Sequence, residues 1–165
     1  MDYAELLFPP SNPLQTYCLV FLAGTLTVSS LSDLRRLAAQ ADFAEVWGAY
    51  AAAMFLADSY LGLSGQLEPF SFVAKWLMVA VALAASVRGG NLSLMDSAAL
   101  AALYSTLTPG YVIMAAVLTL LSNEMLKPLL RRHSEAGAYP FLPTVLAVNV
   151  ILLAILAFGG IEPYL

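Results

Sequence analysis

The stretch LQTYCLVFLAGTLTVSSLSDLRR, residues 14–36, begins as an apolar run and ends in a cluster of charged residues. The run is close to the roughly 17–25 residues that an α-helix needs to cross the hydrocarbon core of a bilayer. Basic residues directly after such a run are typical of the cytoplasmic side of a membrane protein. We therefore interpret this stretch as a first transmembrane helix with a cytoplasmic flank.

The composition of the chain supports this interpretation. Of its 165 residues, 61% are hydrophobic and 11% are charged, whereas about 25% are charged in an ordinary soluble domain. The net charge of −4 provides no basic surface for nucleic acid. The single cysteine, Cys18, cannot form an intrachain disulfide, and there is no CxxC or His-rich cluster. We therefore expect no metal, no cofactor and no nucleic-acid partner.

Similar apolar runs recur along the chain, separated by short breaks that contain Pro, Gly or charged residues. We expect an all-α, polytopic membrane protein of the cell membrane, with residues 1–165 forming one domain in the lipid bilayer. Its six predicted transmembrane helices lie at about 14–31, 43–63, 70–87, 92–108, 111–126 and 141–159.

The positions of the basic residues predict the orientation of these helices. Six of the seven follow the first, third or fifth predicted helix, so the positive-inside rule places those loops in the cytoplasm. The loop at 64–69 and both ends of the chain carry acids, and neither they nor the short loop at 109–110 contain a basic residue, so we expect the N- and C-termini outside. The exception is Lys75, inside the third helix. The six are Arg35, Arg36, Arg88, Lys127, Arg131 and Arg132.

Two of the carboxylates on the cytoplasmic side of this topology are candidates for catalysis. Asp33 lies at the end of the first predicted helix and Asp96 lies about one turn into the fourth. Carboxylates at the edge of the hydrocarbon are costly, and they tend to have a function. Two that meet cannot both ionise easily, so they share one proton; one can then activate a water while the other protonates a carbonyl. This is the chemistry of an aspartic protease, and the pattern does not assign the base.

Three segments resemble a known family in their order along the chain. DLRR at 33–36, continuing to Phe43 and Trp47, is similar to the segment after the first catalytic aspartate of prepilin and archaeal preflagellin (prearchaellin) peptidases, which are GxGD-type intramembrane aspartic proteases. DSAALAAL at 96–103 is similar to the helix that carries the second aspartate of that family. YPFLP at 139–143 resembles the start of its last helix.

The resemblance implies an aspartic endopeptidase with Asp33 and Asp96 as catalytic residues facing the cytoplasm. Its substrates would be membrane-anchored, pilin-like or archaellin-like precursors, from which it would remove a short basic leader. The glycines that the family has three and one residues before the second aspartate are Ser93 and Met95 here. The chain lacks the cysteine-rich region of the bacterial members, so it is more similar to the compact archaeal type. Two alternatives are a proteolytically inactive relative that binds or inserts such precursors, and a small transporter.

Further residues are candidates for substrate binding. We expect Gly89 and Gly90 to give flexibility beside an extended substrate, with Ser93 and Met95 lining its path. The other two candidates are Asp42 and Glu45, at the start of the second predicted helix, where acids would attract a basic leader. An alternative for these two acids is that they only complement the dipole of that helix.

Several of the same residues also have a purely structural interpretation. Ser93 and Asp96 have the spacing of a capping box, and DLRR at 33–36 is also a typical charged end for a membrane helix. Asp58 is an intramembrane acid and hence a functional candidate. However, it lies at a depth similar to that of Lys75, so we expect these two residues to form a structural ion pair.

Overall fold

The computed structural model describes residues 13–36, 41–88, 92–130 and 140–159, and this part of the chain folds into six α-helices and no strands. The all-α prediction is therefore confirmed. In chain order the helices are α2 (Pro13–Arg36), α3 (Ala41–Leu63), α4 (Pro69–Arg88), α5 (Leu94–Thr106), α6 (Pro109–Leu130) and α7 (Leu142–Gly159).

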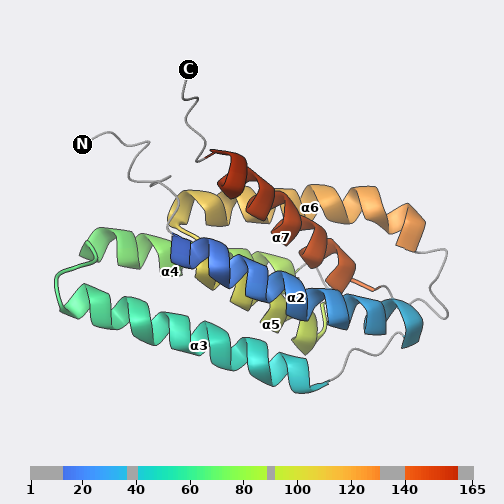
Figure 1. The fold of residues 1–165 in the computed structure, drawn as a ribbon, viewed down its shortest axis with the longest axis horizontal. Coiled ribbons are helices and arrows are strands. Elements are labelled where there is room, and N and C mark those ends of the chain that lie inside the picture. Colours follow the sequence, from blue (N-terminus) through green and yellow to red (C-terminus); the bar gives the residue numbers. More distant parts are fainter. Residues whose placement is uncertain (1–12, 37–40, 89–91, 131–139, 160–165) are drawn as a thin grey trace.

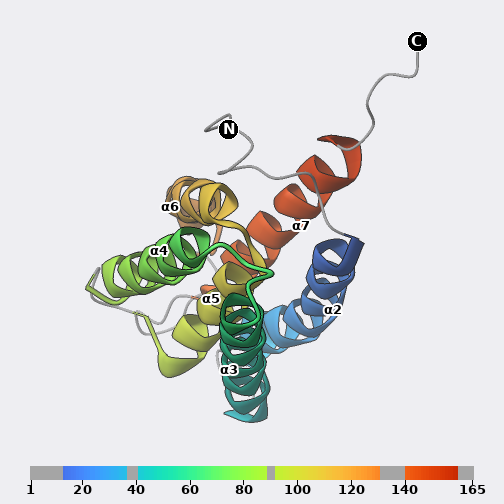
Figure 2. The same cartoon turned by 90° about the vertical axis from the view of Figure 1, so that its left-hand side faces the viewer.

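The helices form an elongated bundle in which successive helices run in opposite directions. One end of the bundle carries the ends of α2, α4 and α6 together with the starts of α3, α5 and α7 (Figure 1). Seen from one end, α5 lies at the centre, with α4 and α6 on one side and α2 and α7 on the other (Figure 2). Helix α5 packs against α2, α3, α4 and α7. The fold therefore brings the end of α2, which carries Asp33, to the start of α5, which carries Asp96.

The central helix α5 is shorter than the apolar run at 92–108 suggests. It has 13 residues, nine of which are buried by the surrounding helices. At 1.5 Å per residue it is about 20 Å long, which is less than the roughly 30 Å of a hydrocarbon core. Helix α5 begins after its N-cap residue Ser93 and ends at Thr106, with Leu107 in an extended conformation shortly before Pro109, so local signals limit its length.

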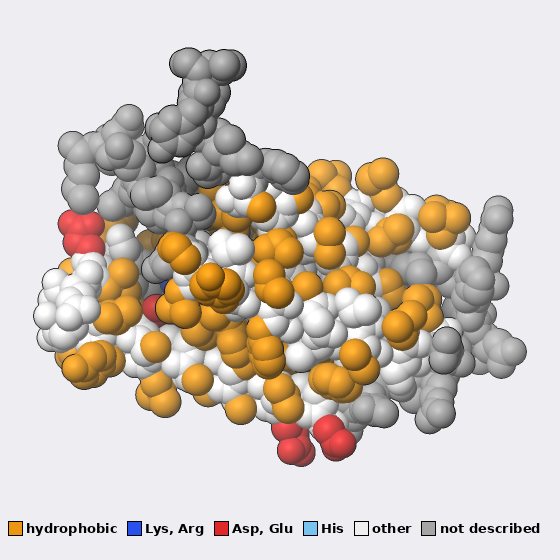
Figure 3. Space-filling model, in the orientation of Figure 1, with side chains coloured by type: hydrophobic (Ala, Val, Ile, Leu, Met, Phe, Trp, Pro, Cys, Tyr) orange, Lys and Arg blue, Asp and Glu red, His pale blue; other side chains and the backbone are white. Residues whose placement is uncertain are grey.

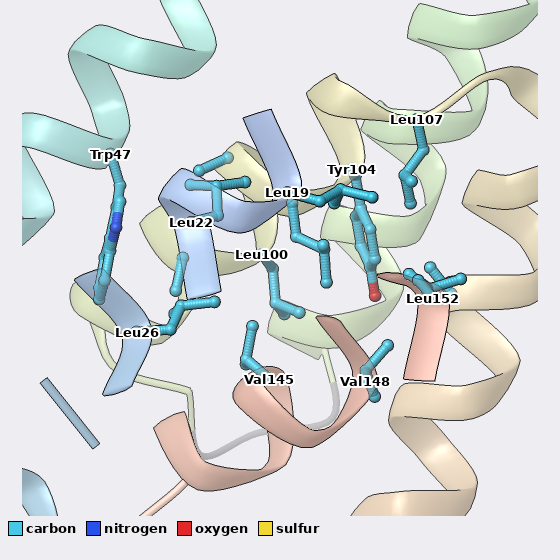
Figure 4. Packing of buried hydrophobic residues seen from close by; sticks show 14 of the residues in the cluster. Leu19, Leu22, Leu26, Trp47, Leu100, Tyr104, Leu107, Val145, Val148 and Leu152 are labelled. Atoms are coloured by element: carbon cyan, nitrogen blue, oxygen red, sulfur yellow. The ribbon is translucent and has the colours of Figure 1, made fainter. Parts of the chain in front are cut away.

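The core is built on one face of α2. Leu19, Leu22 and Leu26 recur every three or four residues, so they share a face of the helix, and each is at most 1% exposed. Figure 4 shows this face opposite side chains from α5 and α7. The opposing residues are Leu100 and Tyr104 of α5 and Val145, Val148 and Leu152 of α7.

Side-chain hydrogen bonds join different helices of the bundle. In apolar surroundings such a bond contributes about 1–2 kcal/mol at most, but its direction specifies which helix faces are paired. The bonds are Trp47 Nε1 to Thr25 Oγ1 (3.1 Å), Tyr50 Oη with Thr106 Oγ1 (3.0 Å), Tyr104 Oη to Thr119 Oγ1 (3.4 Å) and Asn149 Nδ2 to the Leu19 carbonyl (3.3 Å).

The turn between α3 and α4 requires a glycine. Gly65 has φ of +73°, a left-handed conformation in which other residues are strained. The Gln66 N–H donates to the Leu61 carbonyl at 3.0 Å and the Gly65 N–H donates to the Gly62 carbonyl at 3.2 Å. This is the Schellman arrangement that ends many helices. Pro69 then begins α4, at a position where its missing N–H costs nothing.

Two of the described helices are long and apolar enough to cross a membrane by length and composition. They correspond to Pro13–Leu34 of α2 and Pro109–Leu129 of α6. Helices α4 and α7 contain shorter apolar stretches, Pro69–Ala84 and Leu142–Ala157. The described structure thus supports a membrane location through two helices.

The outer surface of the bundle carries many large apolar side chains. Hydrophobic groups are spread over the face seen in Figure 3. The exposed residues come from α2, α3, α4, α6 and α7, with Leu94 at the start of α5. A soluble monomer rarely exposes so much contiguous apolar surface, which is typical of contact with lipid or with a protein partner.

Candidate active site

Asp33 lies in the last turn of α2, because the helix continues beyond the apolar run to Arg36. Its side chain is half-buried. The backbone N–H of Leu142 donates a hydrogen bond to the Asp33 carboxylate. Leu142 is the first residue of α7, where N–H groups have no acceptor within their own helix. A backbone N–H at the start of α7 therefore binds the carboxylate of Asp33 in the last turn of α2.

The sequence does not reveal this donor, because every residue except proline carries a backbone N–H. The only indication is the apolar run that starts at 141, directly after Pro140. A helix that starts there has free N–H groups in its first turn. Which carboxylate they reach depends on the packing of α7 against α2.

Asp96 occupies the third position of α5 and forms a capping box with Ser93. The Asp96 N–H donates to Ser93 Oγ at 3.2 Å. In return, Asp96 Oδ2 accepts from the Ser93 backbone N–H at 2.9 Å and from the Ser93 hydroxyl at 2.8 Å. Asp96 is only 8% exposed, so these bonds satisfy a carboxylate that water barely reaches. The capping box that the spacing of Ser93 and Asp96 predicts is therefore observed.

The two aspartates also lie near one another. Helices α2 and α5 pack together, and the Asp33 and Asp96 carboxylates are close enough for their negative charges to repel. Ionising both carboxyl groups at once is therefore unfavourable, because each negative charge disfavours the other. The capping box and the carboxylate pair are thus compatible, since the capping box fixes the position of Asp96 beside Asp33.

The remaining residues expected near substrate have different surroundings. Met95 is 8% exposed and packs in the hydrophobic core, so its side chain does not line an open surface. Ser93 is exposed as a residue, but its hydroxyl is used by Asp96. Gly89 and Gly90 lie outside the described residues.

Asp42 and Glu45 lie in the first turns of α3, and both side chains are exposed. The start of α3 is at the same end of the bundle as the end of α2 and the start of α5 (Figure 1). A role in complementing the dipole of α3 fits their position. So does the attraction of a basic segment to this end of the molecule, because exposed acids remain available to a partner.

Asp58 and Lys75 form a buried ion pair between α3 and α4, as the sequence suggests. Lys75 Nζ donates to Asp58 Oδ2 at 2.6 Å, and both residues are 9% exposed. The Trp76 indole N–H donates to the same oxygen at 3.0 Å, a contact that the sequence does not indicate. Glu124 and Lys127 form a second, exposed pair at 3.3 Å. Neither pair involves Asp33 or Asp96.

Within the described ranges, no three His, Cys, Asp or Glu side chains are grouped so that they could hold a metal ion. Comparison of the chain with models of protein families, with curated proteins and with solved structures finds no match.

Proposed function

We propose that the chain is a membrane-embedded aspartic endopeptidase that removes a short basic leader from membrane-anchored, pilin-like or archaellin-like precursors. The observation that carries this proposal is the approach of the Asp33 and Asp96 carboxylates, whose charges repel across the contact between α2 and α5. The resemblance of the segments around both aspartates to prepilin and preflagellin peptidases supports the same pair. An acidic pair in partly buried surroundings is a frequent feature of catalytic sites.

The chemistry follows from one proton shared between two carboxyl groups. The ionised aspartate takes a proton from a water molecule, and the water oxygen adds to the scissile carbonyl carbon. The protonated aspartate gives its proton to the carbonyl oxygen. The amide nitrogen then accepts the proton that the first carboxylate took from water, and the C–N bond breaks. The aspartate that protonated the carbonyl recovers its proton from the product carboxyl group.

The direct test combines the purified chain, in detergent or liposomes, with candidate precursors that have basic leaders. We expect a decrease in the size of the precursor, with a new N-terminus just after the leader. A precursor that lacks its basic leader is the control, and we expect it to remain intact. If no precursor from a broad panel is shortened, the chain is not a peptidase of this class.

A second candidate, favoured by the capping box, is a precursor-binding protein without peptidase activity. The hydrogen bonds between Ser93 and Asp96 account for the burial of Asp96 without any chemistry. The same assay separates the two candidates. A non-catalytic relative would retain the precursor in a pull-down and leave its length unchanged.

The proposal includes six membrane crossings, with the short α5 crossing inside the bundle of its neighbours, both termini outside and the dyad facing the cytoplasm. The alternation of helix directions in Figure 1 is compatible with it. In a variant with Cys18→Ser, we expect a cysteine at Gln66, in the turn between α3 and α4, to react with an impermeant maleimide from outside. A cysteine at Glu45 should react only after the membrane is permeabilised. Labelling of both from outside would exclude this topology.

The acids at the start of α3 provide a test of leader recognition. We expect the double change Asp42→Asn and Glu45→Gln to raise KM for a basic leader several-fold with little change in kcat, because exposed charges mainly steer association. The effect should diminish at high salt. Glu68→Gln is the matched control, since Glu68 is also exposed but lies just before α4, at the other end of the bundle. An equal rise in KM for the control would show that local charge at α3 is not responsible.

A further inference from the structure

The hydrogen bonds around the two aspartates are unequal. Asp96 Oδ2 accepts two of them, from the backbone N–H and the hydroxyl of Ser93. Among the described residues, the donor to the Asp33 carboxylate is the Leu142 N–H. Hydrogen bonds donated to a carboxylate stabilise its ionised form, and a bond to a charged group is stronger than one between neutral groups. The contacts therefore stabilise a negative charge on Asp96 more than on Asp33.

The positions of the two residues within their own helices act in the same direction. Asp96 lies in the first turn of α5, where the partial positive charge of a helix N-terminus stabilises an anion. Asp33 lies in the last turn of α2, where the partial negative charge of the C-terminus opposes one. Burial acts the other way, since Asp96 is only 8% exposed. The two bonds from Ser93 offset this cost of burial.

From this geometry we infer that Ser93 is a positioning residue that holds Asp96 as the ionised member of the pair, so that the shared proton resides on Asp33. The inference rests on the proposed function for its mechanistic consequence. Asp96 is then the base that takes a proton from water, and Asp33 is the acid that protonates the scissile carbonyl. The capping box is thus part of how the two aspartates acquire different roles.

The geometry singles out the hydroxyl of Ser93. This oxygen accepts from the Asp96 N–H and donates to Asp96 Oδ2, so it fixes both the backbone and the carboxylate of the same residue. Alanine at this position would keep the backbone donor and lose both hydroxyl bonds. Threonine would keep the hydroxyl, and it is also a favourable N-cap residue. The two variants therefore separate the role of the hydroxyl from that of the backbone.

The test uses the purified full chain and a hydrophobic carbodiimide, which modifies protonated carboxyl groups, with the label on Asp33 and Asp96 quantified by mass spectrometry. In the parent chain we expect the label mainly on Asp33. In Ser93→Ala the label on Asp96 should rise while the label on Asp33 falls, because a shared proton can only be redistributed between the two. Ser93→Thr should restore the parent pattern.

Ser97→Ala is the matched control. The Ser97 hydroxyl lies on the same turn and donates to the Ser93 carbonyl at 3.1 Å, not to the Asp96 carboxylate. We expect the parent labelling pattern in this variant. A merely structural loosening of α5 would raise the label on Asp96 without lowering the label on Asp33. That outcome, or an unchanged pattern in Ser93→Ala, would overturn the inference.

Cleavage gives a second measurement. We expect Ser93→Ala to lower kcat by about tenfold or more with KM nearly unchanged, since it removes a hydrogen bond to a charged group that acts in the reaction. The labelling experiment requires no precursor. Opposite changes in the two labels in a chain that cleaves nothing would support the assignment of the proton and reject the peptidase. Normal cleavage by the Ser93→Ala variant would reject the role of Ser93 without contradicting the proposed peptidase activity.

Discussion

Asp33→Asn and Asp96→Asn should each lower the rate of precursor cleavage by at least about 100-fold, because an amide can neither take a proton from water nor donate one to the carbonyl. Both variants should express and melt much like the parent chain. The amide that replaces Asp96 keeps an oxygen for the Ser93 donors, so the cost in the free energy of unfolding should be about 1 kcal/mol or less. The measurements are cleavage rate and thermal melting in the same detergent.

The double variant tests whether the two aspartates work as one unit. Residues of one catalytic unit are strongly non-additive, so the double change should be no worse than either single change. If Asp96 only caps α5, Asp96→Asn should retain nearly full activity, whatever the effect of Asp33→Asn. Substantial turnover by Asp96→Asn would exclude the proposed dyad and leave the capping box as the role of Asp96.

The largest effect on stability should come from the ion pair between α3 and α4. Among the described residues, Lys75→Met leaves the buried Asp58 charge with the Trp76 N–H as its donor, and Asp58→Asn removes the charge that pairs with Lys75. Breaking a buried pair costs roughly 3–5 kcal/mol. At about 3 kcal/mol, the melting temperature of a protein of this size would fall by roughly 6–12 °C.

The double variant of Asp58→Asn with Lys75→Met should recover much of this loss, because neither charge then remains unpaired. The new amide oxygen would still accept from Trp76. Glu124→Gln is the matched control, since its pair with Lys127 is exposed and worth about 0–1 kcal/mol. Losses that simply add in the double variant would show that the contact between Asp58 and Lys75 contributes no coupling energy.

The periodicity and charge pattern of the sequence were enough to predict the helices and one contact between residues on different helices. The apolar runs predicted six helices close to those observed, because the pattern of apolar residues and the Pro and Gly breaks are local properties of the chain. The pairing of Asp58 with Lys75 was also predictable, since two opposite charges at similar depth in an apolar bundle have few other partners. The spacing of Ser93 and Asp96 indicated the capping box.

Other features were decided by the packing of the helices. The sequence treats the run at 92–108 as one more membrane helix, whereas in the fold α5 is a short central helix enclosed by its neighbours. Met95 became a core residue for the same reason. An apolar residue is equally suited to a position that faces lipid and to one that faces another helix, so local sequence does not distinguish these two environments.

The sequence by itself determined the helices, their order and the presence of an acid at the end of α2 and near the start of α5, because propensity, capping and hydrophobic periodicity act within a few residues. Only the tertiary structure decided that the Leu142 N–H donates a hydrogen bond to the Asp33 carboxylate, and that the charges of Asp33 and Asp96 are close enough to repel. It also decided that Trp76 shares the acceptor of Lys75. These contacts join residues on different helices, and their geometry depends on how α2, α5 and α7, or α3 and α4, pack against each other.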